Sequence, residues 1–194
     1  MEKIVGRPKL KSALIYTVLT LVAAWILFDS HAWQGMRIVA LVLVIVAFVI
    51  ILPGVSYCQM MWKVDEHHLL YTYHHTFLDK IISFYQFIWH RQPIYQMKLC
   101  LDQIDYIYVT YNGVPRFPFG GIGYDLLFET HMFDGSIYTF EALVTRDRKS
   151  FNKAIVFMQS KGINFKDPYD ILEYLKTGQY LSYYLEELEA SHHD

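Results

Sequence analysis

The chain has 194 residues, of which 17 are lysine or arginine and 19 are aspartate or glutamate, so its formal net charge is −2 at pH 7. This balance, without a large basic cluster, argues against a nucleic-acid-binding protein. Its 2 cysteines, Cys58 and Cys100, are a poor disulfide framework and agree with a reducing compartment.

Two charge-free apolar runs lie near the N-terminus, Ser12–Phe28 and Ile38–Trp62. Insertion of the second run into a bilayer should be favourable by roughly 4 to 8 kcal/mol, since Ile38–Leu52 holds only Ile, Val, Leu, Phe and Ala. A signal peptide would carry a single apolar stretch, and core helices would carry polar residues on one face. The pattern predicts an N-terminal region of residues 1–58 with two transmembrane helices, at about 12–31 and 37–57.

Basic residues near the ends of these runs predict the orientation. The N-terminal tail holds Lys3, Arg7, Lys9 and Lys11, whereas the connecting loop offers only Arg37. Because lysine and arginine favour the cytoplasmic side, we expect a multi-pass protein of the plasma membrane with both termini in the cytoplasm.

Alternating apolar residues after the hairpin predict six strands in antiparallel order. Asp134 and Gly135 can form the tight turn between the last two strands. The predicted strands are Gln59–Val64, His68–His75, Tyr95–Leu101, Ile104–Tyr111, Tyr124–Phe133 and Ser136–Ala142.

Three helices are predicted after the strands. The first, at 147–161, has an apolar face of Phe151, Ala154, Ile155 and Met158 and ends at Gly162. A second begins at Asp167 and Pro168 and ends at Gly178. The third, Gln179–Ala190, is amphipathic through Leu181, Tyr184, Leu185 and Leu188, so residues 163–194 form a helical extension.

The segments "WKVDEHHLLYTY", "MKLCLDQIDYIYV" and "YDLLFETHMFDGSIYTFEA", followed by "DRKSFNKAIVFMQSKGI", give a layout of strands closed by a helix. Together with the two spans, this layout resembles bacterial membrane-anchored proteins with a pleckstrin-homology-like (PH-like) domain, over roughly residues 10–162. The resemblance implies an α+β membrane protein in which residues 59–162 form a small antiparallel sheet or partly open barrel closed by C-terminal helices. It implies a binding or scaffolding module without chemistry of its own. Phosphoinositide recognition does not carry over, because Asp65 and Glu66 occupy the first strand turn.

An insertion at 76–93 departs from this layout. Its apolar residues recur at helical spacing, although Phe84 and Phe87 blur the division into two faces. One interpretation is a helix on the membrane surface, with Lys80 and Arg91 near anionic lipid. The other is a helix that packs on its own sheet or on the late helices. The candidate contact residues here are Phe77, Ile81, Tyr85, Ile88, Trp89 and Arg91.

The glycine-rich stretch Gly113–Gly123 is predicted to be a long loop between strands. It lacks the lysine and the following helix of a phosphate-binding loop. Arg116, Phe117 and Phe119 are candidate contacts to a partner or the bilayer, and the alternative is that they cover one end of the barrel.

The histidines His67, His68, His74 and His75 fall in a short window. Neighbouring residues on a strand point to opposite faces, which is poor geometry for a metal site. We therefore expect solvent-facing or interfacial histidines, and the sequence predicts no metal, cofactor or catalytic residue.

These observations favour a non-enzymatic integral membrane protein whose cytoplasmic PH-like domain is an interaction or scaffolding module. Expected partners are the lipid bilayer and a membrane protein or a second copy, with no nucleic acid. Two alternatives stay open: a small metal-dependent membrane enzyme or sensor that uses the histidine-rich segment, and an immunity-type protein against a membrane-active toxin.

Overall fold

The structure is a computed structural model that describes residues 2–30, 35–57, 60–115, 122–142 and 148–192. The chain forms two compact units. We call one the hairpin unit, which comprises Arg7–Gln59 and Thr72–Tyr95. We call the other the sheet unit, which comprises Met1–Gly6, Met60–Tyr71 and Gln96–Asp194. The contacts thus group the start of the N-terminal tail with the sheets and the 76–93 insertion with the hairpin.

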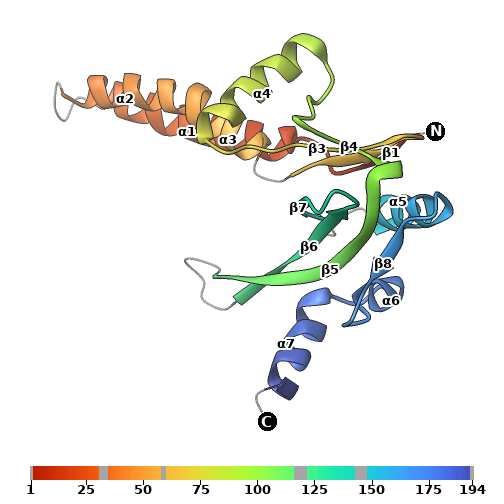
Figure 1. The fold of residues 1–194 in the computed structure, drawn as a ribbon. Coiled ribbons are helices and arrows are strands. Elements are labelled where there is room, and N and C mark those ends of the chain that lie inside the picture. The colour runs from red at the N-terminus through yellow and green to blue at the C-terminus, as the bar shows by residue number, and fades with distance from the viewer. Residues whose placement is uncertain (1, 31–34, 58–59, 116–121, 143–147, 193–194) are drawn as a thin grey trace. The chain divides into compact units, whose positions relative to one another are not determined.

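The hairpin unit begins with α1 (Leu10–Asp29), and a second helical segment of 22 residues, Gly35–Ser56, follows it. Figure 1 shows the two running antiparallel side by side. The Lys9 N–H donates to the Ser56 carbonyl over 2.9 Å and joins the open ends of the pair. The second segment consists of α2 (Gly35–Val46), a π-helix (Ala47–Ile51) and α3 (Leu52–Ser56).

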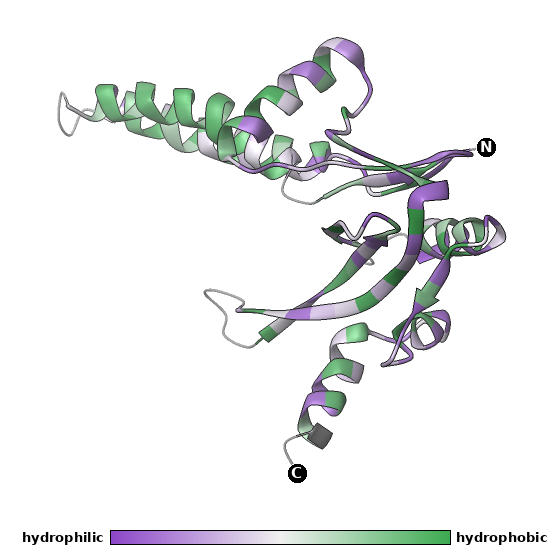
Figure 2. Ribbon diagram, viewed as in Figure 1, coloured by the Kyte–Doolittle hydropathy of each residue, from purple (hydrophilic) through white to green (hydrophobic). Residues whose placement is uncertain are grey.

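Both helical segments are long and apolar enough to cross a membrane, with mean hydropathies of 1.9 and 3.3. Figure 2 shows the apolar character continuing along both. Large apolar side chains point outward, while the residues buried between the helices are small, which is how membrane helices pack closely. The small buried residues are Ala13, Thr17, Ala24, Ala40 and Ala47.

The sheet unit contains two four-stranded sheets. In the first, all neighbours are antiparallel, and the strand order β1-β2-β3-β4 begins with a strand from the N-terminal tail. Its strands are β1 (Lys3–Val5), β2 (Trp62–Val64), β3 (His68–Tyr71) and β4 (Met97–Cys100).

The second sheet has the order β7-β6-β5-β8, and a short 3-10 helix (Leu101–Gln103) leads into it. β8 runs parallel to β5, whereas the other pairs are antiparallel. The strands are β5 (Ile104–Pro115), β6 (Ile122–Met132), β7 (Ile137–Glu141) and β8 (Asn164–Lys166).

Three helices follow the strands, α5 (Arg148–Ser160), α6 (Ile171–Lys176) and α7 (Leu181–His192). The predicted apolar face of α5 is confirmed, since Phe151, Ala154, Ile155 and Met158 are all buried. Asp167 was predicted to begin the second helix, but α6 begins at Ile171. Asp167 instead accepts hydrogen bonds from the N–H groups of Ile171 and Leu172 at the start of α6.

Trp62 lies at the centre of the sheet unit's core. Its ring meets those of Phe128, Phe140 and Phe151 at centroid distances of 6.1, 5.9 and 6.1 Å, and its indole N–H donates to the Ala142 carbonyl over 2.9 Å. Edge-on packing of this kind adds about 0.5 to 1.5 kcal/mol per aromatic pair beyond the buried area.

The mixed α+β class with apolar N-terminal helices and sheets is confirmed. The prediction was one small antiparallel sheet or a partly open barrel, and the described strands form two four-stranded sheets without a closed barrel. Each of the six predicted strands overlaps an observed strand, β2 to β7, in antiparallel pairs, but the set was incomplete. β1 and the parallel strand β8 were not predicted, and β5 extends to Pro115 instead of ending at Tyr111.

Candidate functional site

The insertion forms one helix, α4 (Phe77–His90), and both of its ends are fixed by local interactions. Thr76 Oγ1 accepts from the Asp79 N–H over 3.3 Å, and Asp79 Oδ2 accepts from the Thr76 N–H over 2.7 Å, which is a capping box. The bond from the Thr76 N–H lowers the pKa of Asp79. At the other end Arg91 takes the left-handed conformation, with φ of 56°. Helix α4 therefore starts and stops at defined residues.

A narrow face of α4 is buried. Ser83 and Phe84 are each 2% exposed, and Phe87 is half-buried. The ring of Tyr57, which follows α3, lies 6.3 Å from Phe87 and 5.5 Å from His74. His74 Nε2 is in turn 3.1 Å from Ser83 Oγ. The two phenylalanines that blurred the sequence pattern thus belong to the packed side of the helix.

Helix α4 also contacts the backbone of the hairpin, where the Tyr85 hydroxyl donates to the Phe48 carbonyl over 3.3 Å. The π-helix explains why this carbonyl is available. In the π register the Leu52 N–H bonds to the Ala47 carbonyl, so the next bond, to Phe48, would need an N–H on Pro53. Proline has none. Tyr85 therefore satisfies a carbonyl that Pro53 leaves open.

Gly54 permits the close approach of α4 to α3. A Cβ atom at this position would lie 2.9 Å from Phe77 Cε2 and 3.3 Å from Phe77 Cζ. Contacts under 3.0 Å force a shift of the neighbour, so a larger residue at position 54 would displace the ring of Phe77 from its place against α3. The sequence pattern did not indicate that Pro53 and Gly54 would lie against α4.

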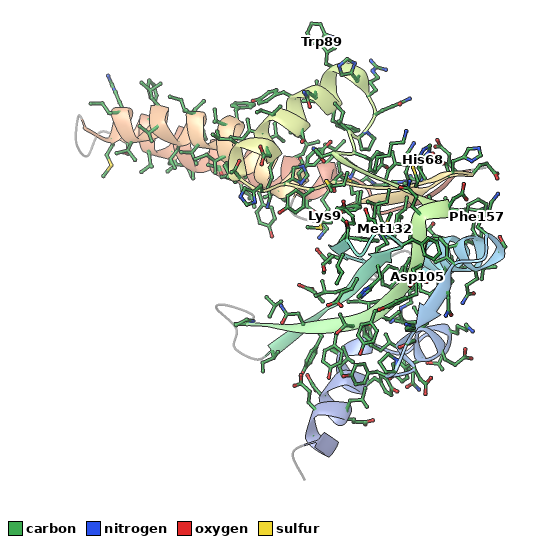
Figure 3. The ribbon with its side chains drawn as sticks, in the orientation of Figure 1. Lys9, His68, Trp89, Asp105, Met132 and Phe157 are labelled. Atoms are coloured by element: carbon green, nitrogen blue, oxygen red, sulfur yellow. The ribbon has the colours of Figure 1, made fainter. Side chains whose placement is uncertain are left out.

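The remaining apolar residues of α4 form an exposed strip, which we call the α4 band. Trp89 is 85% exposed, and Figure 3 shows it pointing away from the rest of the unit at the outer end of the helix. Contiguous exposed apolar surface of this kind marks a contact with a membrane or another protein. The α4 band consists of Phe77, Leu78, Ile82, Tyr85, Ile88 and Trp89.

The predicted contact residues fall into three groups. Phe77, Tyr85, Ile88 and Trp89 lie in the α4 band, and Arg91 is exposed at the cap of the same helix. Ile81 is partly buried beside them. The structure does not describe the candidates of the glycine-rich stretch, Arg116, Phe117 and Phe119. Leu78 and Ile82, which share the helical spacing, complete the band.

The four histidines of the histidine-rich segment, His67, His68, His74 and His75, have local partners. The N–H groups of His67 and His68 donate to Asp65 Oδ1, and the His75 ring stacks on Tyr73 at 6.1 Å. Burial lowers the pKa of His74, and the nearby Lys80 lowers it further. Within the described part of the chain, no three His, Cys, Asp or Glu side chains converge as a metal site would require.

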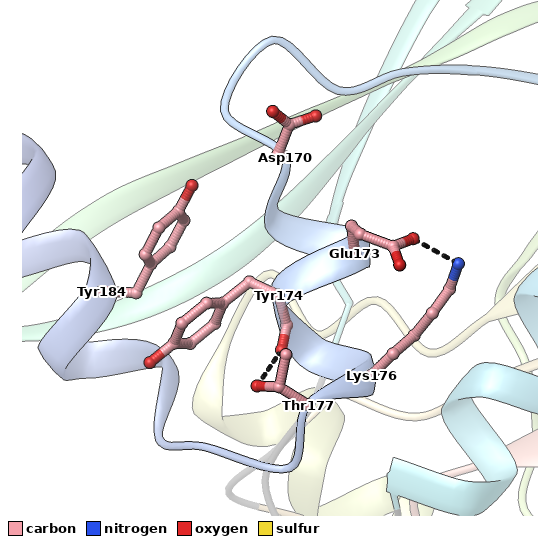
Figure 4. A pocket seen from close by; sticks show the side chains of 6 residues that line it. All are labelled: Asp170, Glu173, Tyr174, Lys176, Thr177 and Tyr184. Atoms are coloured by element: carbon pink, nitrogen blue, oxygen red, sulfur yellow. Dashed lines mark hydrogen bonds and ion pairs between the residues drawn. The ribbon is translucent and has the colours of Figure 1, made fainter.

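Two of the shallow cavities that are lined by described residues lie on the sheet unit. The first, of about 420 Å³, is lined by residues of α6 and α7 and by the residues next to α6. Figure 4 shows its two tyrosines, Tyr174 and Tyr184, whose rings stack at 4.1 Å, and the Glu173–Lys176 ion pair. The Tyr184 hydroxyl donates to the Tyr169 carbonyl. Most of its polar groups thus serve the local structure.

The second cavity, of about 480 Å³, is an open groove beside β1 and α5. Its lining includes two lysines, an amide and a hydroxyl around two apolar side chains, and no carboxylate. The residues are Lys3, Asn152, Lys153, Val156, Phe157 and Ser160. No sequence pattern indicated this groove, because Lys3 and α5 are far apart in the chain.

Comparisons with protein-family models, with curated proteins and with solved structures give no match to this chain.

Proposed function

We propose that this protein is a non-enzymatic membrane anchor that carries a binding module. Its hairpin crosses the plasma membrane with both termini in the cytoplasm, the α4 band lies in the lipid boundary beside it, and the PH-like sheet unit acts as an interaction or scaffolding surface. The observation that carries the proposal is the exposed α4 band on the same compact unit as the two apolar helices.

The exposure of the hairpin supports a membrane environment. Only 17% of the most apolar window of each helix is buried within the protein, whereas the core helices of soluble proteins are mostly buried. Burying apolar surface is favourable by about 25 cal/mol per Å², so side chains such as Leu41, Ile45 and Trp25 need a cover. A bilayer supplies that cover around the whole circumference of the hairpin.

The way α4 is held supports its place in the lipid boundary. Every backbone polar group in hydrocarbon needs a partner, and the Tyr85 hydroxyl supplies one for Phe48. Arg91 and His90 are exposed at the C-terminal end of the helix and Lys80 is partly exposed, so basic groups are available for headgroup phosphates. An apolar band with basic residues at its border is typical of a helix in the interface.

Trp89 offers a direct test because its removal leaves the packed face of α4 intact. The full-length protein and its Trp89→Phe variant are reconstituted in vesicles, with and without brominated lipid. The emission spectrum of the variant is subtracted from that of the unmodified protein, which leaves the emission of Trp89. We expect the difference spectrum to be blue-shifted and quenched by brominated lipid. A red-shifted difference spectrum that is quenched by a water-soluble agent would place the α4 band in water and overturn its assignment.

Topology is tested separately with reporters fused after Gly35 and after Gly162. We expect opposite sides of the membrane, with the second reporter in the cytoplasm. Reporters on the same side would refute the spanning hairpin whatever the result for Trp89.

A further inference from the structure

The groove beside β1 and α5 differs in charge from the rest of the protein. The whole chain carries a net charge of −2, yet α5, with the sequence RKSFNKAIVFMQS, has three basic residues and no acidic one. Lys3 and Lys153 line the groove itself without a carboxylate among the lining residues. The carboxylate of Glu66 forms an ion pair with Lys161, which does not line the groove. This ion pair lowers the pKa of Glu66 to about 2.

The apolar part of the groove has a matching arrangement. Val156 is 61% exposed, and Phe157, half-buried beside it, carries the Lys161 ammonium 5.6 Å from its ring centroid. Apolar surface next to lysines, with the Asn152 amide as a further hydrogen-bonding group, suits a ligand that has an anionic head and a hydrocarbon body. A purely ionic ligand would leave the apolar surface of Val156 exposed to water.

The covalent chain keeps this groove close to the start of the anchor. Lys3 is joined to Leu10, the first residue of α1, by a short segment that can extend at most about 24 Å. If the hairpin spans the membrane, Lys3 therefore stays within that distance of the end of a span. The ligand that is most concentrated there is the phospholipid of the cytoplasmic leaflet, whose anionic members attract basic segments.

We propose that the groove lined by Lys3, Lys153, Val156 and Phe157 binds the headgroup of an anionic phospholipid. The two lysines contact the phosphate, and the glycerol and upper acyl carbons lie on Val156 and Phe157. This inference rests on the proposed membrane anchoring and adds a lipid-binding role for the sheet unit.

The test is a titration of the full-length protein, purified in a non-ionic detergent, with phosphatidylglycerol and with phosphatidylcholine, read by native mass spectrometry. We expect preferential retention of phosphatidylglycerol. Each lysine near an anionic lipid is worth about a fivefold change in affinity, so the Lys3→Gln, Lys153→Gln double variant should bind roughly 25-fold more weakly. Lys153→Arg, which keeps the charge, should retain the binding.

The matched control is the Lys98→Gln, Lys149→Gln double variant, which removes the same charge from exposed positions of β4 and α5 outside the groove. It should bind phosphatidylglycerol as the unmodified protein does. Equal losses in both double variants would show diffuse attraction and overturn the groove. Displacement by soluble glycerol phosphate would identify a free phosphate ester as the ligand, and equal retention of phosphatidylcholine would refute the preference for anionic lipid.

The result stays separable from the anchoring proposal. Opposite-side reporters together with no preference for phosphatidylglycerol would remove this inference alone. Same-side reporters together with a selective loss in the groove variant would remove the anchoring and leave an anionic lipid site.

Discussion

The two antiparallel helical segments of the hairpin and the core of the sheet unit bury different kinds of residue. Between the helices of the hairpin the buried residues are small, such as Ala13 and Ala47, and the large side chains of Ile45 and Trp25 point outward. In the sheet unit Trp62 and other large aromatic residues fill the core. Apolar composition alone therefore does not tell which side chains face inward. Large apolar residues fill a core in water, whereas small residues line the contact between helices in a membrane.

The largest expected effect concerns a side chain buried in the core of the sheet unit. Trp62→Ala removes a fully buried ring and the hydrogen bond to Ala142, so it should lower the free energy of unfolding of the sheet unit by about 3 to 5 kcal/mol. The matched control is Trp25→Ala, because Trp25 is 68% exposed on α1, and it should change stability by about 1 kcal/mol or less. Denaturation in mild detergent, followed by near-ultraviolet circular dichroism, measures both. Similar losses would remove the contrast between the units.

The second prediction tests the outward side. Ile45 is 61% exposed on the second helical segment and Ile137 is 57% exposed on β7, so the same change to lysine is matched in exposure. Ile45→Lys should weaken membrane insertion by about 3 kcal/mol, because a lysine at the centre of a span costs that much. Ile137→Lys should alter stability by less than about 0.5 kcal/mol. An insertion reporter for residues 35–56 gives the first quantity and denaturation the second. Unchanged insertion of Ile45→Lys would contradict a lipid-facing hairpin.

Sequence periodicity predicted the elements that have a long apolar pattern and that pack against segments nearby in the sequence. The buried face of α5 followed from its helical spacing, and Gly135, with φ of 85°, forms the predicted turn between β6 and β7. β1 was missed because Lys3–Val5 is three residues in a basic tail, too short for a pattern. β8 was missed because its partner β5 is distant in sequence.

The candidate site shows a different limit. Helical spacing correctly placed a helix in the insertion, but α4 carries apolar residues over most of its circumference. The sequence could not say that Phe84 would be buried and Leu78 exposed, since that depends on where Tyr57 and Gly54 lie. The open carbonyl of Phe48 depends on the π register before Pro53, which has no sequence pattern of its own.

The third prediction concerns the bond that holds α4 to the hairpin. Tyr85→Phe removes the hydroxyl that donates to the Phe48 carbonyl, and interhelical hydrogen bonds in membranes are worth about 0.6 to 1.7 kcal/mol. We expect faster hydrogen exchange of the α4 amides at a fixed pH, by a factor of roughly 3 to 17. Tyr16→Phe removes a hydroxyl from a tyrosine that is 55% exposed on α1 and should leave the exchange of α4 unchanged. Identical exchange in both variants would show that α4 is held by its apolar contacts alone.

The smallest effect is a dependence of α4 docking on pH. Burial lowers the pKa of His74 from its ordinary value of 6.5, with Lys80 acting in the same direction and Asp79 opposing it. The docked state therefore binds a proton less readily than the undocked state, so docking is fully favourable above pH 6.5 and weakens as the pH falls towards the lowered pKa. Solvent screens part of this effect, because His74 is only half-buried.

Spin labels at Leu14→Cys and Ile82→Cys, with Cys58 and Cys100 replaced by serine, measure the docking of α4 in reconstituted protein as the pH is lowered. Both label sites are exposed in the hairpin unit, with 55% and 54% of their surface accessible. The distance distribution should broaden at low pH in this protein and in a His90→Gln control, whose histidine is exposed. His74→Gln keeps a group that can donate to Ser83 and does not titrate, so its distribution should stay constant. If the distribution still broadens in His74→Gln, another group causes the pH dependence, and protonation of His74 does not weaken the docking of α4.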